Sequence, residues 1–289
     1  MKKLFFLLVA FTMVLFVSCK ESEEDAMEVY TRAIKDYGQR AGDSVTLSMQ
    51  GDCAYQGKEY QITVSMDCDY QRNSRFGLHG IMDVNMESPD GIGVTFPAEI
   101  YMVTEGEDLL VYASIYNQWY YVPLEGFAGF YEEYLSAGVM DSFYERLPEL
   151  VSCKSLGKTD FNDEKVRRIQ VAYLEDYIGK VLEIYGTGYL DLAGNDGNSG
   201  LTEEDLEEFS SMLDGVSYEA YINKDDSLVG YYMDLESLFT TVVGNMEEFN
   251  EIGPFFDISG FVLVNLGGNV PEEIVVPQEV VDNSIFMPL

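Results

Sequence analysis

Strict alternation of apolar and polar side chains between Tyr60 and Tyr70 is the sequence feature that most constrains the fold. Successive side chains of a β-strand point to opposite faces, so this pattern predicts a strand with one apolar face and one polar face. Further strands are predicted at residues 45–49, 76–86, 94–103, 109–115 and 118–123. Because no helical segment separates these strands, the sequence predicts an antiparallel meander.

Other parts of the chain carry apolar residues at helical spacing. This spacing predicts helices at residues 26–37, 127–147, 174–185 and 237–250. Hairpins are predicted at residues 153–173 and 217–235, with final strands near 261–265 and 274–276. Strands and helices occur together without a repeat or a long linker, so we expect an α+β class and a single domain over residues 26–289.

The charge of the chain excludes one class of partner. The sequence holds 17 Lys and Arg against 51 Asp and Glu, for a formal net charge of −34. Nucleic-acid binding draws most of its affinity from basic side chains, so we expect no nucleic-acid partner. Hydrophobic residues make up 47% of the chain, which supplies ample apolar surface for a folded core.

The N-terminal segment has the organisation of a secretory signal peptide. Lys2 and Lys3 precede an apolar run that ends at Val17 and is followed by Ser18 and Cys19. A run of about 14 residues is shorter than the roughly 20 that a transmembrane helix needs. We therefore expect residues 1–18 to be removed and the mature protein to work outside the cytoplasm.

The residues before Cys19 resemble a bacterial lipobox, with Phe16 in place of the usual Leu. The cysteine of a lipobox is lipidated and becomes the mature N-terminus, which implies an anchor of acyl chains such as palmitate on Cys19. A plain secretory peptide with an incidental cysteine is the alternative. The acidic residues 19–25 read as a short tether that would hold the folded body off an anionic bilayer, or simply as a solvated segment.

Three cysteines follow the tether, so at most one disulfide can form within a chain. Cys53 and Cys68 lie on successive predicted strands, but a tight turn at Gln56 and Gly57 would pair Cys53 with Tyr60. A Cys53–Cys68 bridge is therefore not favoured. Neither these two residues nor Cys153 has the spacing of a metal site.

Catalytic and metal-binding motifs are scarce in this chain. His79 is the only histidine and falls on the polar phase of its strand, so a histidine-based triad or a two-histidine metal site within one chain is excluded. The loop from Gly194 to Asp205 resembles a calcium-binding EF-hand loop poorly, because several ligand positions are replaced. We expect no cofactor, no metal and no catalysis, and we rank a hydrolase that uses carboxylates or a cysteine last.

The order of these features resembles the bacterial lipoproteins with a LolA/LppX-like fold. A lipobox, a short tether, an amphipathic helix and long strands that end in Trp119 and Tyr120 carry the resemblance, which spans most of the mature chain. It implies a strongly curved antiparallel sheet, an open half-barrel covered by helices, with an apolar cavity between the layers. It also implies lipid or acyl-chain carriage, although some members are envelope sensors. No signature residue of the carriers has a counterpart here.

Large apolar side chains on the predicted strands and helices are candidates for lining such a cavity, and methionine suits adaptable apolar binding. The candidates are Tyr60, Met66, Tyr70, Phe76, Met82, Met86, Phe96, Met102, Trp119, Phe130 and Tyr134. Ordinary core packing is the alternative for each of them. Trp119, the only tryptophan, either borders the cavity or anchors the last strand of the meander.

Two functions remain open at this stage. The first is a lipid-anchored lipoprotein of the cell membrane or envelope that binds a hydrophobic small molecule or lipid. The second is an interaction or sensory module that presents the acidic sheet face, including Asp67, Asp69 and Asp83, to a basic or cell-wall-associated partner; the identity of any protein partner is not given by the sequence. An apolar pocket of several hundred cubic ångströms favours carriage, and a solidly packed core favours the second function.

Overall fold

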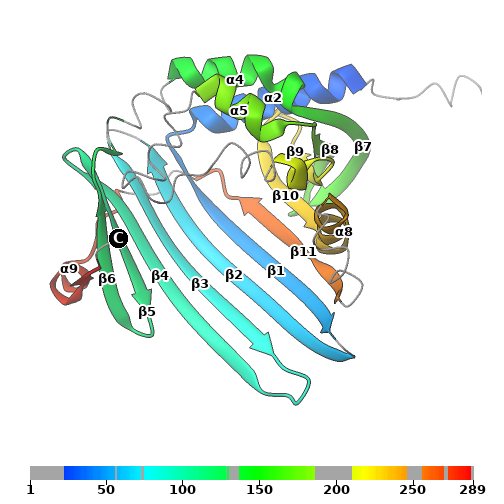
Figure 1. Ribbon diagram of the computed structural model, residues 1–289. Coiled ribbons are helices and arrows are strands. Elements are labelled where there is room, and N and C mark those ends of the chain that lie inside the picture. Colours follow the sequence, from blue (N-terminus) through cyan, green and yellow to red (C-terminus); the bar gives the residue numbers. More distant parts are fainter. Residues whose placement is uncertain are drawn as a thin grey trace, which may run out of the picture.

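A computed structural model gives the structure of the protein (Figure 1). It describes residues 23–55, 57–72, 75–127, 129, 137–185, 210–245, 256–269 and 273–287. Its main element is a sheet with the strand order β12-β6-β5-β4-β3-β2-β1-β11-β10-β9-β8-β7. Neighbouring strands run antiparallel except for β12, which pairs parallel to β6.

The first six strands form a meander of neighbours along the sheet. They are β1 (Gly42–Tyr55), β2 (Lys58–Arg72), β3 (Phe76–Glu87), β4 (Gly93–Glu105), β5 (Asp108–Ile115) and β6 (Gln118–Leu124). The remaining strands are β7 (Val151–Phe161), β8 (Glu164–Tyr173), β9 (Ser217–Ile222), β10 (Leu228–Asp234), β11 (Phe256–Leu266) and β12 (Ile285–Phe286). β11 returns to pair with β1, and this pairing joins the two halves of the sheet.

Tight turns connect the hairpins where the sequence permits positive φ angles. Asn162 and Asp163 between β7 and β8 have φ angles of 49° and 62°, a combination that asparagine and aspartate tolerate well. The β1–β2 turn has Gly57 at a φ angle of 75° and pairs Cys53 with Tyr60, as the sequence predicted. Cys53, Cys68 and Cys153 are all free thiols.

The helices are α2 (Glu23–Gln39), α4 (Ala137–Leu150), α5 (Tyr177–Tyr185), α8 (Leu235–Asn245) and α9 (Gln278–Asn283). α2, α4 and α5 lie together over one end of the sheet, whereas α8 lies beside β10 and β11 (Figure 1). α9 lies by β6, near the opposite edge of the sheet. α2 begins at Glu23, so this helix includes residues 23–25 of the expected tether.

The main core lies between the helical end and strands β7 to β11. Ala26, Val29, Tyr30 and Ala33 form the buried stripe of α2, at the spacing of one helix face. They pack with buried side chains of α4 and the sheet, such as Leu150. This core explains why α2 forms where the sequence predicted a helix: its apolar stripe has a sheet to cover.

A smaller core lies on the opposite side of the sheet. Tyr101, Tyr112 and Val280 are its buried members, and Ile274 and Val276 pack against them. Residues 274–276 therefore pack as an irregular segment, and the expectation of a strand there is wrong. Their apolar character reflects contact with the sheet face rather than pairing within it.

The expected α+β class and antiparallel sheet are confirmed. The sheet is neither closed nor strongly curled in the described part of the chain, since its order ends at β12 on one side and β7 on the other. The strongly curved half-barrel expected from the resemblance is therefore not seen in this form.

Candidate ligand-binding face of the sheet

The register of the sheet aligns apolar side chains across neighbouring strands. Met66 of β2 pairs with Met82 of β3, and Met82 pairs with Ala98 of β4. Two residues farther along β3, Val84 pairs with Phe96 of β4. Because paired residues place their side chains on the same side of a sheet, these side chains form continuous rows across the strands.

We call the surface that these rows form the apolar face. It consists of odd-numbered residues 45–49 of β1 and 109–115 of β5, and of even-numbered residues 60–70 of β2, 76–86 of β3, 94–102 of β4 and 262–266 of β11. None of these positions holds a charged side chain. Val45 and Val264 pack with the stripe of α2, so the face lies on the same side as the helices.

One part of the apolar face is covered and another is open. Near the helices Leu266 is only 8% exposed. Farther away, Met86, Val94 and Ile115 are 42%, 45% and 48% exposed, and Met82 between the two regions is partly exposed. Full burial of such a side chain is worth roughly 1.5–3 kcal/mol, so this surface retains unused capacity to bind apolar groups.

The structure brings most of the candidate residues to this face. Tyr60, Met66, Tyr70, Phe76, Met82, Met86, Phe96 and Met102 all occupy positions of the apolar face. Phe76 also contacts Phe127, with ring centroids 6.0 Å apart. Phe130 and Tyr134 lie outside the described residues.

Trp119 is separated from the other candidates. Its position in β6 belongs to the opposite side of the sheet, where its ring lies 5.9 Å from that of Tyr101. It packs in the smaller core with Val280 of α9. Trp119 therefore anchors β6 against the C-terminal segment and does not border the apolar face.

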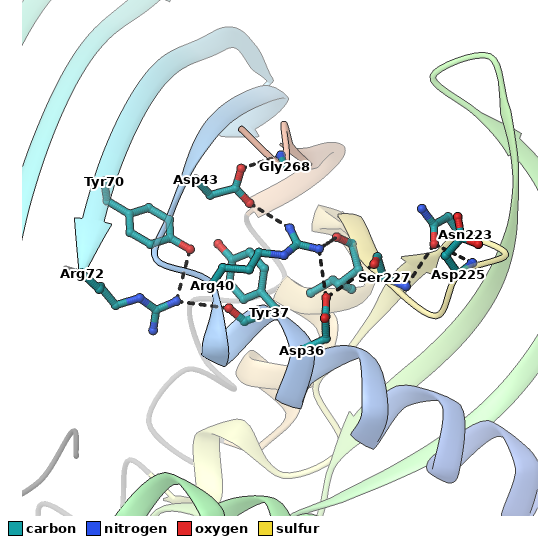
Figure 2. Close-up of polar contacts among 11 residues, drawn as sticks. Asp36, Tyr37, Arg40, Asp43, Tyr70, Arg72, Asn223, Asp225, Ser227 and Gly268 are labelled. Atoms are coloured by element: carbon teal, nitrogen blue, oxygen red, sulfur yellow. Dashed lines mark hydrogen bonds and ion pairs between the residues drawn. The ribbon is translucent and has the colours of Figure 1, made fainter. Parts of the chain in front are cut away.

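Polar residues at the helical end of the apolar face were missed in the sequence analysis (Figure 2). Asp43 of β1 continues the odd-numbered row of Val45, yet its side chain is fully buried. Nη1 of Arg40 donates to Oδ2 of Asp43 at 3.1 Å, and the backbone N–H groups of Ser44 and Gly268 donate to Oδ1 at 2.8 and 2.6 Å. The buried carboxylate is thus compensated in charge and in hydrogen bonding.

Arg72, the last residue of β2, continues the row of Tyr70 at the same end (Figure 2). Its Nη2 donates to the backbone oxygen of Tyr37 and to the hydroxyl oxygen of Tyr70, both at 3.3 Å. Its guanidinium carbon lies 5.2 Å from the ring centroid of Tyr70. Its Nε is buried and has no hydrogen-bond partner. The sequence feature that could have identified Arg72 is a basic residue at the end of the apolar row of a predicted strand.

The thiols of Cys68 and Cys153 are poor nucleophiles. Burial raises the pKa of the Cys68 thiol to about 11, and the negative charge of Asp69 adds to this increase. Burial raises the pKa of Cys153 to about 12. Because the thiolate is the reactive form, both groups are largely inert at neutral pH.

The opposite, polar face carries the acidic residues and the single histidine. Nε2 of His79 lies 2.9 Å from Oε1 of Glu99, and its ring stacks on Tyr101 at 4.3 Å. Asp69 accepts a hydrogen bond from the Ser44 hydroxyl at 2.5 Å. Within the described ranges, no group of three or more His, Cys, Asp or Glu side chains is placed to hold a metal ion. The calcium-like loop from 194 to 205 lies outside those ranges.

Three hollows of about 400–460 Å³ lie on the described part of the molecule, and Tyr60 lines one of them and Phe76 another. One is at the β1–β2 and β3–β4 hairpin ends near Asp52 and Glu87, and another is near Arg40 and Asn223. None of these three is lined by Met66 or Met82. Among the described residues, the methionine rows therefore line none of these three hollows, and part of the apolar face is open.

Comparisons with known proteins give similarities of fold. No protein-family model and no curated protein matches the sequence. The structure is similar to that of the lipoprotein LppX from Mycobacterium tuberculosis, with a TM-score of 0.39 and 11% identity over 88% of this chain and 100% of that chain. LprF from Mycobacterium bovis gives a TM-score of 0.37 and 11% identity over 88% and 96%.

A LolA superfamily protein from Nitrosomonas europaea is also similar, with a TM-score of 0.18 and 7% identity over 88% of this chain and 96% of that chain. The similarity is one of structure, to the same group of proteins that the sequence resembles. At these identities it concerns the fold alone, so the function has to be inferred from the residues of this chain.

Proposed function

We propose that this protein is a lipid-anchored extracytoplasmic lipoprotein that binds a lipid or acyl chain along the apolar face, without catalysis. The observation that supports the proposal is an uncharged sheet face, several strands wide, whose outer part stays exposed at Met86 and Val94. Large apolar patches on a folded chain typically mark binding sites. The chain holds 51 acidic and 17 basic residues, so a face several strands wide without a charged side chain differs clearly from the rest of the sequence.

The chemistry of the face suits a flexible hydrocarbon chain. Met66, Met82 and Met86 are unbranched and polarisable, so they adapt to ligands of variable shape. Each methylene group removed from water contributes about 0.8 kcal/mol, so an acyl chain gains affinity along the whole row. The ligand would lie between the sheet and the helical layer of α2, α4 and α5.

The N-terminal features complete the proposal. Removal of residues 1–18 and acylation of Cys19 would anchor the folded domain to the cell membrane or envelope through a short acidic segment. In the part of the chain that the structure describes, no helix is long and apolar enough to cross a membrane. Cys19→Ser should abolish the covalent acyl mass that denaturing mass spectrometry detects on the purified full chain.

Native mass spectrometry of the full chain, released from detergent micelles, tests ligand binding. We expect about one non-covalent lipid per chain, as for a single site, and this lipid is lost on denaturation while acyl groups on Cys19 remain. Met82→Trp should displace the lipid. Ile81→Trp is the matched control, because Ile81 is 47% exposed on the opposite face of the same strand.

Two outcomes would contradict the proposal. The first is a lipid-free mass that does not change when palmitate or phospholipid is added. The second is equal loss of lipid in Met82→Trp and Ile81→Trp. A lipid-free protein would favour the alternative function, in which the acidic face with Asp67 and Asp83 meets a protein partner.

A further inference from the structure

We propose that Arg72 binds the anionic head group of the ligand whose hydrocarbon chain lies on the apolar face. The inference rests on the proposed function and names its ligand class: a single-chain amphiphile with a carboxylate or phosphate head. It depends on the position of Arg72, on its unused hydrogen-bonding capacity and on the lack of a compensating carboxylate among the residues that the structure describes.

The position of Arg72 is at the end of the apolar row of β2. Tyr70, Cys68 and Met66 precede it on the same face, and the backbone oxygen of Tyr37 in α2 accepts from its guanidinium. Tyr144 of α4 also lies close enough for the positive charge of Arg72 to lower its pKa, although burial of Tyr144 raises that pKa more strongly. Arg72 thus lies where the apolar face meets the helices.

The guanidinium of Arg72 has donors to spare. A guanidinium carries five N–H donors, and in Arg72 only Nη2 is engaged, with two neutral oxygen atoms. Its Nε is buried without a partner, which is costly for a polar group. In Figure 2 the remaining edge of the guanidinium points away from the Arg40 network. Because Nη2 has used both of its N–H groups and Nε is buried, the two N–H groups of Nη1 are the donors that remain for an anion.

No carboxylate of the described residues compensates the charge of Arg72. Among the described residues, Arg72 takes part in no ion pair, whereas its neighbour Arg40 pairs with both Asp36 and Asp43. This contrast is notable in a chain with 51 acidic and only 17 basic residues, where a carboxylate is rarely far away. Partly buried charges are normally paired, so a ligand anion is the partner that would complete this site.

The distances fit a single acyl chain. Six residues of β2 separate Arg72 from Met66, which corresponds to about 20 Å at about 3.3 Å per residue. A lipid chain spans about half of a hydrocarbon core of about 30 Å. A chain of about 15 Å whose head group lies at Arg72 therefore covers Tyr70 and Cys68 and ends about 5 Å short of Met66 along the strand.

Calorimetric titration of the detergent-solubilised full chain with four probes tests this assignment. The probes are palmitate, palmityl alcohol, lysophosphatidic acid and inorganic phosphate. We expect the wild-type chain to bind palmitate or lysophosphatidic acid at least about tenfold more tightly than palmityl alcohol, as a charge-assisted pair requires. Inorganic phosphate alone should not bind measurably, and the charged amphiphile that binds more tightly identifies the head group.

Arg72→Gln should lower the affinity for that charged amphiphile about tenfold and leave the affinity for palmityl alcohol unchanged. Arg72→Lys should retain part of the preference, because it keeps the charge but loses the planar fork. Arg75→Gln is the matched control, since Arg75 is exposed and close in sequence. Lost affinity for all amphiphiles in Arg72→Gln, which indicates a structural role only, would overturn the assignment.

An unchanged preference for the charged probe in Arg72→Gln would also overturn it. Binding of inorganic phosphate as tight as that of lysophosphatidic acid would do the same, because the hydrocarbon chain would then contribute nothing. Failure of the proposed function has a different signature: neither palmitate nor palmityl alcohol binds to the wild-type chain.

Discussion

The carboxylate of Asp43 and the guanidinium of Arg40 form a charge pair of 3.1 Å at the point where α2, β1 and the segment after β11 meet. The carboxylate is fully buried, whereas the guanidinium remains 18% exposed. Nη2 of the same arginine also donates to the backbone oxygen of Leu228 at 3.4 Å. This pair therefore connects the first helix to both halves of the sheet.

Replacement of Asp43 should destabilise the protein strongly. Asp43→Asn leaves Arg40 without its buried partner, and loss of one member of a buried pair costs about 3–5 kcal/mol. Urea unfolding followed by circular dichroism measures the change. Asp36→Asn is the control, because Asp36 also pairs with Arg40 but is 55% exposed, and a change above about 1 kcal/mol there would contradict this account.

The close approach of Gly38 to Tyr144 leads to a second prediction about stability. A Cβ atom at Gly38 would overlap with the hydroxyl oxygen of Tyr144, so α2 and α4 approach each other through a position without a side chain. Gly38→Ala should cost about 1–3 kcal/mol despite the higher helix propensity of alanine. Thermal unfolding should show the loss, and adding Tyr144→Phe should restore part of it.

Gly244 in α8 provides the opposite control for this prediction. No atom of the described residues lies within 4 Å of a Cβ atom built there, so alanine meets no obstacle from them. Gly244→Ala should therefore raise the free energy of unfolding by up to about 1 kcal/mol. Equal effects at Gly38 and Gly244 would show that packing against Tyr144 does not decide the outcome.

The thiols of Cys68 and Cys153 should resist alkylation in the folded state. Their pKa values, raised by burial to about 11 and about 12, lie above the ordinary value of about 9. At pH 8 the thiolate fraction of Cys68 is then about 100-fold smaller than in the unfolded chain. Peptide mapping after iodoacetamide treatment, with and without urea, measures both rates, and equal rates would refute the burial argument.

Alkaline pH should weaken the fold. Burial raises the pKa of Tyr101 and of Tyr221 to about 12, with added contributions from Glu99 and Glu219 respectively. The unfolded state releases these protons near pH 10, before the folded state does. The free energy of unfolding should therefore be constant below about pH 9 and fall as the pH rises from 10 through 12.

Urea titrations between pH 7 and pH 11 test this dependence, with tyrosinate absorbance as the second measurement. Tyr221→Phe should reduce the slope, because it removes a group that ionises more readily after unfolding. A stability that stays constant, or rises, above pH 10 would contradict the prediction.

Much of the candidate site could be predicted from local sequence. The alternation from Tyr60 to Tyr70 assigned Met66 to an apolar face, and the turn at Gln56 and Gly57 correctly paired Cys53 with Tyr60. These are properties of neighbouring residues on one strand, and the period of two decides them before any long-range contact forms. The same reasoning placed His79 on the polar face.

Other features depend on contacts between distant segments. Trp119 is a large apolar side chain on a predicted strand, like the other cavity candidates. The C-terminal segment with Val280 nevertheless covers its side of the sheet. Ile274 and Val276 were predicted as part of a strand because a short β-branched apolar run suits both a strand and an irregular segment packed on a sheet. No local pattern distinguishes these cases, since the deciding partner is far away in sequence.

The sequence by itself determined which side chains share a face, because backbone geometry alternates along each strand without regard to the rest of the molecule. Only the tertiary structure decided which parts of those faces stay open and where charge is left unpaired. β11 had to pair with β1 before Gly268 could donate to Asp43, and α2 had to dock before Tyr37 could accept from Arg72. Burial and charge compensation are properties of the assembled layers. Only the tertiary structure therefore shows a partly exposed apolar row that ends in an arginine without an ion pair among the described residues.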